Sequence, residues 1–410
     1  MTMSFARAAL TAALLLGAAN AAYAADAKAS APKLTPAVQK HLMAAQTATN
    51  KKDYAAALAE LDAANQLSNL TPADTVMINS FRLSVHIGLK DYAAADVDAE
   101  AAADADPSAI SDANKEGVYK AAMELALNAK HYDKAAKYAK LLGDLPTPQD
   151  AYTQGLMAQS MYLSGDNAGA AALAQKNLDA AKAAGQRPNR IFLDTLMSTQ
   201  VKMKNEAGAE QSLETLVADY NDPEDWGQML PVTLSAKGMR DIDYLYVGRL
   251  WRLTGTKIDP QDASLFGSTA SRLAFYGDAV AAEKEGGTGF PPADAKANAD
   301  KKSMPAQIAA GAKQGGEYNV KTAEALYGYD MFAEAEQMAR DAKAKGGAKD
   351  PTEPDMVIGM AETAQGKYAD AATVFAGINQ PDPASARIVR LWGYFAKGKA
   401  APPPAAAPAQ

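Results

Sequence analysis

The chain repeats one hexapeptide: Lys52-Asp53-Tyr54-Ala55-Ala56-Ala57 occurs again, unchanged, as Lys90-Asp91-Tyr92-Ala93-Ala94-Ala95. A weaker copy begins at His131, and the pattern returns near the C-terminus as Gly366-Lys367-Tyr368-Ala369-Asp370-Ala371. The aromatic residues of neighbouring copies lie 36, 38 or 40 positions apart. Self-similarity at a period of this size indicates stacked structural repeats, each too small to bury its apolar face alone.

Each repeat is predicted to form two amphipathic helices joined by a short turn. In the last clear repeat, residues 354–365 are the first helix and residues 368–378 are the second. Ala371, Phe375 and Ile378 recur at three- and four-residue steps, so they share one face of the second helix. We expect the small Ala371 where two helices cross closely, and Phe375 in the wider gap beside it.

This order of turn, small residue and large apolar residue resembles the tetratricopeptide repeat family. The resemblance covers residues 36–220 and 316–398, although the first-helix tryptophan of the family is missing from the clear copies. It implies an all-α fold: an α-solenoid of tetratricopeptide-like helix pairs. Residues 384–399 carry Ile388, Leu391 and Trp392 on one face and are expected to be a C-terminal capping helix, which a solenoid needs at its exposed end.

The whole chain is also similar to a group of exported repeat proteins of Gram-negative bacteria. The matching features are Trp226, the motif Tyr-Leu-Tyr-Val-Gly-Arg-Leu-Trp-Arg-Leu-Thr-Gly at residues 244–255, and the closing helix at residues 386–392. This similarity implies a fold and a compartment, and it brings no catalytic residues.

The N-terminus is predicted to be a secretory signal peptide. Arg7 supplies the positive charge, residues 8–19 the apolar run, and Ala22-Tyr23-Ala24 the small-x-small pattern, so cleavage is expected between Ala24 and Ala25. A permanent membrane anchor is the alternative, and the short, alanine-rich run disfavours it. No later segment is long and apolar enough to span a membrane. The mature protein is therefore expected to be periplasmic or secreted.

Seven segments are predicted from these patterns. They are a signal peptide (1–24), a linker (25–35), N-terminal repeats (36–220), degenerate helical repeats (221–285), a Gly/Pro/Lys-rich loop region with one short polar helix (286–316), C-terminal repeats with the capping helix (317–399), and a disordered Pro/Ala tail (400–410).

Charge and composition exclude several classes of function. Aspartate and glutamate number 48 against 41 lysines and arginines, giving a net charge of −7. An acidic balance argues against nucleic acid or anionic lipid as the main partner, because both attract basic surfaces. The chain has no cysteine, so disulfides, thiol catalysis and cysteine-ligated metals are excluded.

No constellation of residues predicts an enzyme, a cofactor or a metal site. His41, His86 and His131 are evenly spaced by 45 residues, but this spacing differs from the repeat period, so we expect scattered, solvated histidines. No HExxH, GxSxG or phosphate-binding glycine motif is present. The acidic run Asp96, Asp98, Glu100, Asp104 and Asp106 is expected to be a solvated face, with a weak site for a cation or a basic partner as the alternative.

In tetratricopeptide proteins the first helices line a concave groove that binds peptides. The resemblance therefore implies partner-groove candidates at the first-helix positions outside the apolar stripe: Gln46, Ser84, Glu124, Asn128, Gln159, Tyr162, Asp194 and Ser198. The set lacks the Lys/Asn/Arg cluster that clamps a C-terminal carboxylate of a chaperone partner, so that activity is disfavoured.

A second candidate site is an aromatic–cationic patch. Tyr246, Arg249 and Arg252 share one predicted helix with Trp251. Such a patch could bind an acidic peptide or a carboxylate. The alternative, which we favour, places Trp251 in the core and the arginines outside.

The sequence thus predicts a non-enzymatic scaffold that binds a protein or peptide in the cell envelope. The alternative is an accessory protein for the assembly or export of an envelope polysaccharide. Sugars stack on clustered aromatic residues, and Tyr162 is the one aromatic residue among the groove candidates. The identity of the partner and homo-oligomerisation stay open.

Overall fold

The repeated hexapeptide is a helix-to-helix turn in the computed structural model, which describes residues 33–401. Lys52 and Lys90 adopt left-handed backbone conformations, with φ of 60° and 62°. The following Asp53 and Asp91 cap the next helix, because each side chain accepts a hydrogen bond from the backbone N–H three residues on. The motif therefore encodes the reversal of the chain and the start of each second helix.

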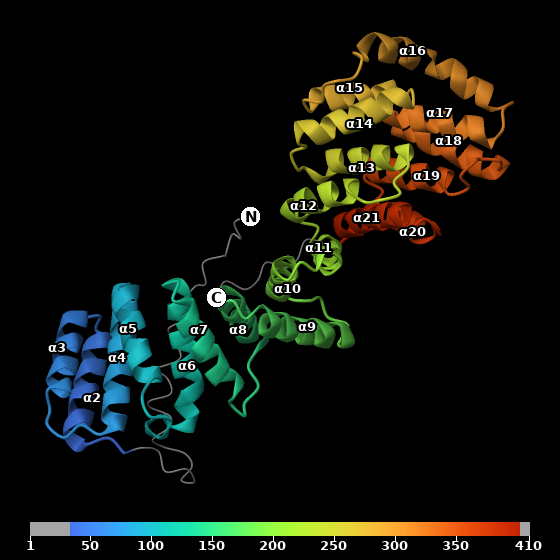
Figure 1. Cartoon of the computed structure of the whole chain (residues 1–410). Coiled ribbons are helices and arrows are strands. Elements are labelled where there is room, and N and C mark those ends of the chain that lie inside the picture. Colours follow the sequence, from blue (N-terminus) through green and yellow to red (C-terminus); the bar gives the residue numbers. More distant parts are fainter. Residues whose placement is uncertain (1–32, 402–410) are drawn as a thin grey trace. The chain divides into compact units, whose positions relative to one another are not determined.

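The chain divides into two compact units, residues 1–205 and 206–410. The described part of unit 1 contains nine α-helices and one short 3₁₀ turn (Figure 1). These are α2 (Pro36–Asn50), α3 (Tyr54–Asn65), α4 (Pro72–Leu89), α5 (Tyr92–Ala103), η1 (Pro107–Ala109), α6 (Asp112–Asn128), α7 (Tyr132–Gly143), α8 (Ala151–Ser164), α9 (Asn167–Ala183) and α10 (Arg190–Lys202).

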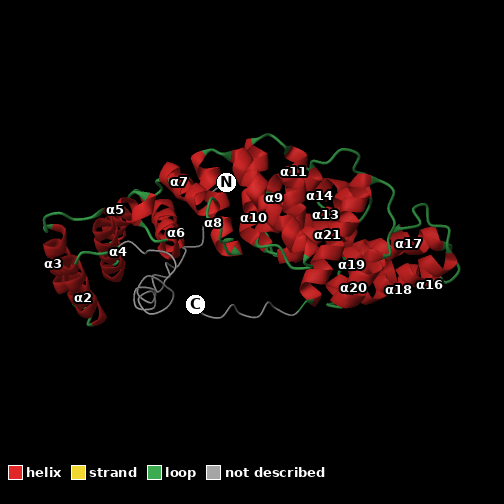
Figure 2. Ribbon diagram, turned by 90° about the horizontal axis from the view of Figure 1, so that it is seen from below, coloured by secondary structure: helices red, strands yellow, loops and turns green. Residues whose placement is uncertain are grey.

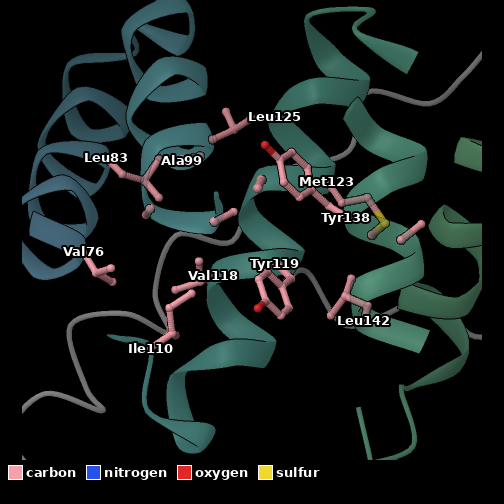
Figure 3. Packing of buried hydrophobic residues seen from close by; sticks show 14 of the residues in the cluster. Val76, Leu83, Ala99, Ile110, Val118, Tyr119, Met123, Leu125, Tyr138 and Leu142 are labelled. Carbon is pink, nitrogen blue, oxygen red and sulfur yellow. The ribbon is translucent and has the colours of Figure 1, made fainter. Parts of the chain in front are cut away.

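Consecutive helices in unit 1 pack as antiparallel pairs, and the second helix of one pair packs on the first helix of the next. Ala57, Ala95 and Ala135 follow the turns at equivalent positions, and all three are fully buried. Ala95 belongs to a buried cluster whose larger members include Met123, Tyr138 and Leu142 (Figure 3). The alternation of small and large apolar residues expected from the sequence is thus the packing of this core.

The described part of unit 2 contains eleven helices. They are α11 (Glu206–Tyr220), α12 (Pro223–Leu234), α13 (Asp241–Thr254), α14 (Pro260–Arg272), α15 (Tyr276–Lys284), α16 (Asp294–Gly311), α17 (Gly316–Gly328), α18 (Phe332–Lys345), α19 (Glu353–Ala364), α20 (Tyr368–Ala376) and α21 (Pro383–Ala400).

The last helix, α21, covers α20 as a capping helix should, and it also returns to the start of unit 2. It packs against α11 and α13 as well as α20 (Figure 1). The Trp392 indole N–H donates to the Tyr246 carbonyl oxygen (3.2 Å), and Arg390 Nε lies 2.7 Å from Glu214 Oε1. Unit 2 is consequently closed by its own C-terminal helix.

All-α structure is confirmed, since residues 33–401 contain helices, turns and loops but no strand (Figure 2). The helix pairs confirm the solenoid of tetratricopeptide-like pairs. The expected cleavage site between Ala24 and Ala25, the rest of the signal peptide and most of the Pro/Ala tail lie outside the described residues.

Two expected boundaries differ from the structure. Residues 286–316 were expected to be mainly loop, yet α16 is eighteen residues long and buries Met304. Its alanines and lysines favour a helix, and Pro305 lies inside it. The first set of repeats was expected to end at residue 220, whereas α11 packs on α12 and α21 and so belongs to unit 2.

Candidate functional site

The eight partner-groove candidates all lie on the first helices of unit 1. Seven are half-buried and Asn128 is exposed. Gln46 and Ser84 lie on the neighbouring helices α2 and α4, and the other six lie on α6, α8 and α10, of which α8 packs against both others. The structure therefore divides the candidates into two groups. We call the solvent-facing side chains of α6, α8 and α10 the first-helix face.

Charged groups and a tyrosine gather where α6 meets the start of α8. The Lys120 ammonium lies 3.6 Å from Asp150 Oδ2 and 5.8 Å from the centre of the Tyr152 ring. Glu124 is one helical turn beyond Lys120, and partial burial raises the pKa of its carboxyl group. The first-helix face thus presents both signs of charge beside an aromatic ring, which suits a polar peptide segment.

Lys120 and Tyr152 are not among the groove candidates predicted from the sequence. Lys120 precedes Glu124 by four residues and Tyr152 precedes Gln159 by seven, so each shares a helix face with a residue that was selected. Extending the selected positions by one or two turns toward the helix N-terminus would have found both. Tyr152 is 45% exposed, and few other aromatic side chains among the described residues are as accessible to solvent.

Asp194 and Ser84 have partners within their own helices, and Ser198 also takes part in an interaction. Arg190 Nε lies 3.4 Å from Asp194 Oδ2. On α4, the Ser84 hydroxyl donates to the Ser80 carbonyl oxygen (3.1 Å). These residues are held in place before any partner arrives.

The acidic run is a solvated face only in part: the expectation was wrong for Asp96 and Asp98, whereas Asp104 and Asp106 are exposed. Asp96 and Asp98 are buried. Three acidic residues at intervals of four along α5 and its C-cap pair with three basic residues at intervals of three at the start of α7. The pairs are Asp96 with His131 (2.8 Å), Glu100 with Lys134 (2.6 Å) and Asp104 with Lys137 (2.6 Å). These carboxylates therefore pair with basic residues of the next repeat, and Glu100 and Asp104 also keep contact with water.

The histidines are separate from one another, but the expectation that all are solvated was wrong. His41 bonds to Glu60 (2.8 Å) and His86 to Asp98 (2.6 Å), and the His86 side chain is only 12% exposed. Burial raises the pKa of Asp98. Within residues 33–401, no group of three or more His, Asp or Glu side chains is arranged to hold a metal ion.

The proposed aromatic–cationic patch does not exist as a surface. Tyr246 and Arg249 are buried, whereas Arg252 is half-buried and lies 3.8 Å from Asp330. Trp251 is in the core, as favoured, but the expectation that Arg249 lies outside was also wrong.

Arg249 is the centre of a buried ionic cluster. Its Nε and Nη2 atoms donate to the two carboxylate oxygens of Asp278 (3.0 and 2.7 Å), and Nη1 donates to Glu324. The Tyr246 hydroxyl donates to the other Glu324 oxygen (2.7 Å), and the Tyr327 ring centre lies 4.6 Å from the guanidinium carbon. Burial raises the pKa of Tyr246, which therefore stays protonated as the donor.

A buried arginine between two acids is satisfied by hydrogen bonds and has no access to a partner. We therefore remove Tyr246 and Arg249 from the candidate binding residues. The cluster joins α13, α15 and α17 within unit 2.

The consecutive packing of helix pairs makes this chain a helical-repeat protein. No protein-family model matches the sequence, and a comparison with curated proteins found no match. None of the described helices is both long and apolar enough to cross a membrane.

Among solved structures, the chain is similar to yeast Tom70 at 10% identity, over 88% of this chain and 95% of that one, with a TM-score of 0.24. It is also similar to the pentatricopeptide repeat protein PPR10 from maize at 12% identity, over 89% of this chain and 62% of that one, with a TM-score of 0.31. At these values neither protein informs on a partner for this chain.

Proposed function

We propose that this chain is a non-enzymatic scaffold that binds an extended segment of a partner protein across the first-helix face. The observation that carries the proposal is the mixed and incompletely buried set of side chains on adjacent helices. Lys120, Glu124 and Gln159 are half-buried and Tyr152 is exposed. Such side chains can exchange water for a peptide's polar groups at little cost in rearrangement.

The cell envelope is the compartment we propose for this activity. The support comes from the sequence: Arg7, the apolar residues 8–19 and the Ala22-Tyr23-Ala24 pattern form an export signal. The negative net charge argues against a nucleic acid as the partner. Protein recovered from the periplasm should begin at Ala25, and an intact Met1 on that protein would contradict the proposed export.

Crosslinking from defined positions tests the scaffold proposal. A photo-crosslinking amino acid at Gln159 or Asn128 should capture the same partner protein in cells. The matched control is Lys176, an exposed residue of the second helix α9. Identical capture from Lys176 and from the first-helix positions would mean that the first-helix face is not the binding surface.

A glycan accessory role is the second candidate function, and Tyr152 is the observation that favours it. Its exposed ring could stack on a sugar. Replacing Tyr152 with alanine should then abolish binding to isolated envelope polysaccharide. If the scaffold proposal holds, the purified protein binds no polysaccharide, and the crosslinks from Gln159 are to protein.

A further inference from the structure

Unit 2 contains a cavity of about 340 Å³ between α14, α15 and the segment that leads into α16. This volume is within the range of small-molecule sites. Polar and apolar side chains both line it, among them Ser271, Arg272, Tyr276, Phe290, Pro291 and Lys296. All of its lining residues belong to unit 2, and none of them is a residue of the first-helix face.

The wall formed by residues 289–293 is held in place by α14 and α15. Phe290 lies directly on Gly267, where any β-carbon would overlap its ring. The Thr288 N–H donates to the Ser264 hydroxyl (2.9 Å), and the Ala293 N–H donates to Glu283 Oε1 (3.0 Å). Because the wall is fixed at both ends, a ligand would not have to order it on binding.

The charged side chains that line the cavity are all cations. Its lining residues include two cations, Arg272 and Lys296, and no carboxylate. Arg272 is held by Asp241 through two hydrogen bonds of 2.9 and 2.7 Å. The Lys296 ammonium lies 5.4 Å from the centre of the Tyr276 ring, and no carboxylate within residues 33–401 forms an ion pair with it. Lys296 is therefore the cation available to an anionic ligand.

The cavity also has an unsatisfied hydrogen-bonding group. The Ser271 hydroxyl is shielded from solvent and has no hydrogen-bond partner in the described part of the chain. Because this oxygen has almost no accessible surface, a ligand in the cavity does not reach it, and it is not counted among the binding groups. Tyr276, Phe290 and Pro291 supply apolar surface on the other sides.

We propose that this cavity binds a small organic carboxylate. The carboxylate group pairs with Lys296, and the apolar part of the ligand lies against Tyr276, Phe290 and Pro291. The same chemistry is offered by a free organic acid and by the C-terminus of a peptide that ends in an apolar residue.

Calorimetry with matched acids and amides tests this proposal. The probes are phenylacetate and phenylacetamide, and the tripeptide acetyl-Gly-Gly-Phe as its free acid and as its amide. A charge-assisted hydrogen bond should make each acid that fits bind about tenfold tighter than its amide. Preference for phenylacetate alone assigns a free acid as the ligand, and tighter binding of the peptide acid assigns a peptide terminus.

The Lys296→Met variant keeps the side-chain stem and removes the charge, so the preference for the acid should disappear while amide binding is unchanged. Lys302→Met is the matched control, since Lys302 is an exposed lysine of the same helix. Melting curves of both variants establish that they are folded. Equal binding of acid and amide by the unmodified protein, an unchanged preference in Lys296→Met, or no saturable binding at millimolar concentration would each overturn the proposal.

Discussion

Gly277 of α15 lies against the backbone of Gly328 of α17, so that a β-carbon on Gly277 would overlap the Gly328 carbonyl oxygen. A β-carbon on Gly328 would in turn come within 2.6 Å of Asp278 Oδ2. The two glycines let the helices approach until Asp278 reaches Arg249. Close helix packing and the buried ionic cluster thus depend on the same pair of residues.

Gly277→Ala should lower the free energy of unfolding by about 1–3 kcal/mol, because the added methyl group meets backbone that cannot move aside. Denaturant unfolding followed by circular dichroism measures the change. Gly227→Ala is the matched control, because its β-carbon would meet only Thr256, at 3.8 Å. The control should be stabilised by up to about 1 kcal/mol from helix propensity. Equal effects of the two substitutions would contradict the close approach.

Arg249→Met should destabilise unit 2 by about 3–5 kcal/mol, because it leaves Asp278 and Glu324 buried without a counter-charge. Arg252→Met removes a half-buried arginine whose partner Asp330 is exposed, so the loss should be below about 1 kcal/mol. The triple change Arg249→Met, Asp278→Leu and Glu324→Met should recover much of the lost stability. If Arg249→Met and Arg252→Met unfold alike, the cluster does not form an ionic core of unit 2.

Stability should decline with rising pH through Glu353. Burial, together with the nearby Glu324, raises the pKa of Glu353 from 4.5 to about 7, against the opposing effect of its partner Lys321. Between these pH values the folded state holds a proton that the unfolded chain releases. The free energy of unfolding therefore falls as pH rises from about 4.5 to about 7, by an amount on the order of 1–3 kcal/mol.

Glu353→Gln removes this contribution, so the variant should gain stability relative to the unmodified protein as pH rises. Thermal melts across the pH range measure the difference. Glu334→Gln, at an exposed glutamate of α18, should leave the slope unchanged. If the difference in melting temperature between Glu353→Gln and the unmodified protein does not change with pH, the raised pKa of Glu353 is not the cause of the decline in stability.

The two alanines Ala55 and Ala57 of the first hexapeptide should respond differently to enlargement. Ala57 is fully buried at a helix crossing, so Ala57→Phe should cost about 1–3 kcal/mol through overpacking. Ala55 is exposed, and Ala55→Phe should change the free energy of unfolding by less than about 0.5 kcal/mol. If the melting curves of Ala57→Phe and Ala55→Phe superimpose, Ala57 does not lie at a close helix crossing, and the positions within the repeat are assigned incorrectly.

The melting temperature should be the same with a chelator, with zinc and with calcium. A metal that bound the folded state would stabilise it by about 2.7 kcal/mol at a hundredfold excess over its Kd. The histidines instead have carboxylate partners on separate helices: His41 with Glu60 and His86 with Asp98. A metal-dependent rise that is lost in a His86→Ala variant would reopen the question of a metal site.

Features encoded by neighbouring residues could be predicted from the sequence. The left-handed Lys52 and Lys90, the capping Asp53 and the small Ala57 all act within one turn and the helix that follows it. Their recurrence made the helix pairs and the all-α class predictable, and the groove candidates do lie on the first helices of their pairs.

Features that depend on distant residues could not be predicted. Arg249 is buried because Asp278 and Glu324 lie 29 and 75 residues further along the chain, and no local pattern pairs them. In the same way, the burial of Asp96 depends on His131 of another repeat. A charged residue on a helix is predicted to be exposed unless a buried partner is known, so both groups were expected to lie in water.

The return of α21 to α11 gives the two units different folding behaviour. Each hairpin of unit 1 meets only its neighbours, so one could be added or lost with a local effect on stability. In unit 2, by contrast, the first and last helices bury their faces only when they pack on each other. This contact brings together residues that are 176 positions apart, such as Arg390 and Glu214. Non-local contacts of this kind slow folding and make it cooperative. We therefore expect unit 2 to unfold as one cooperative unit, and deleting α21 would expose its beginning as well as its end.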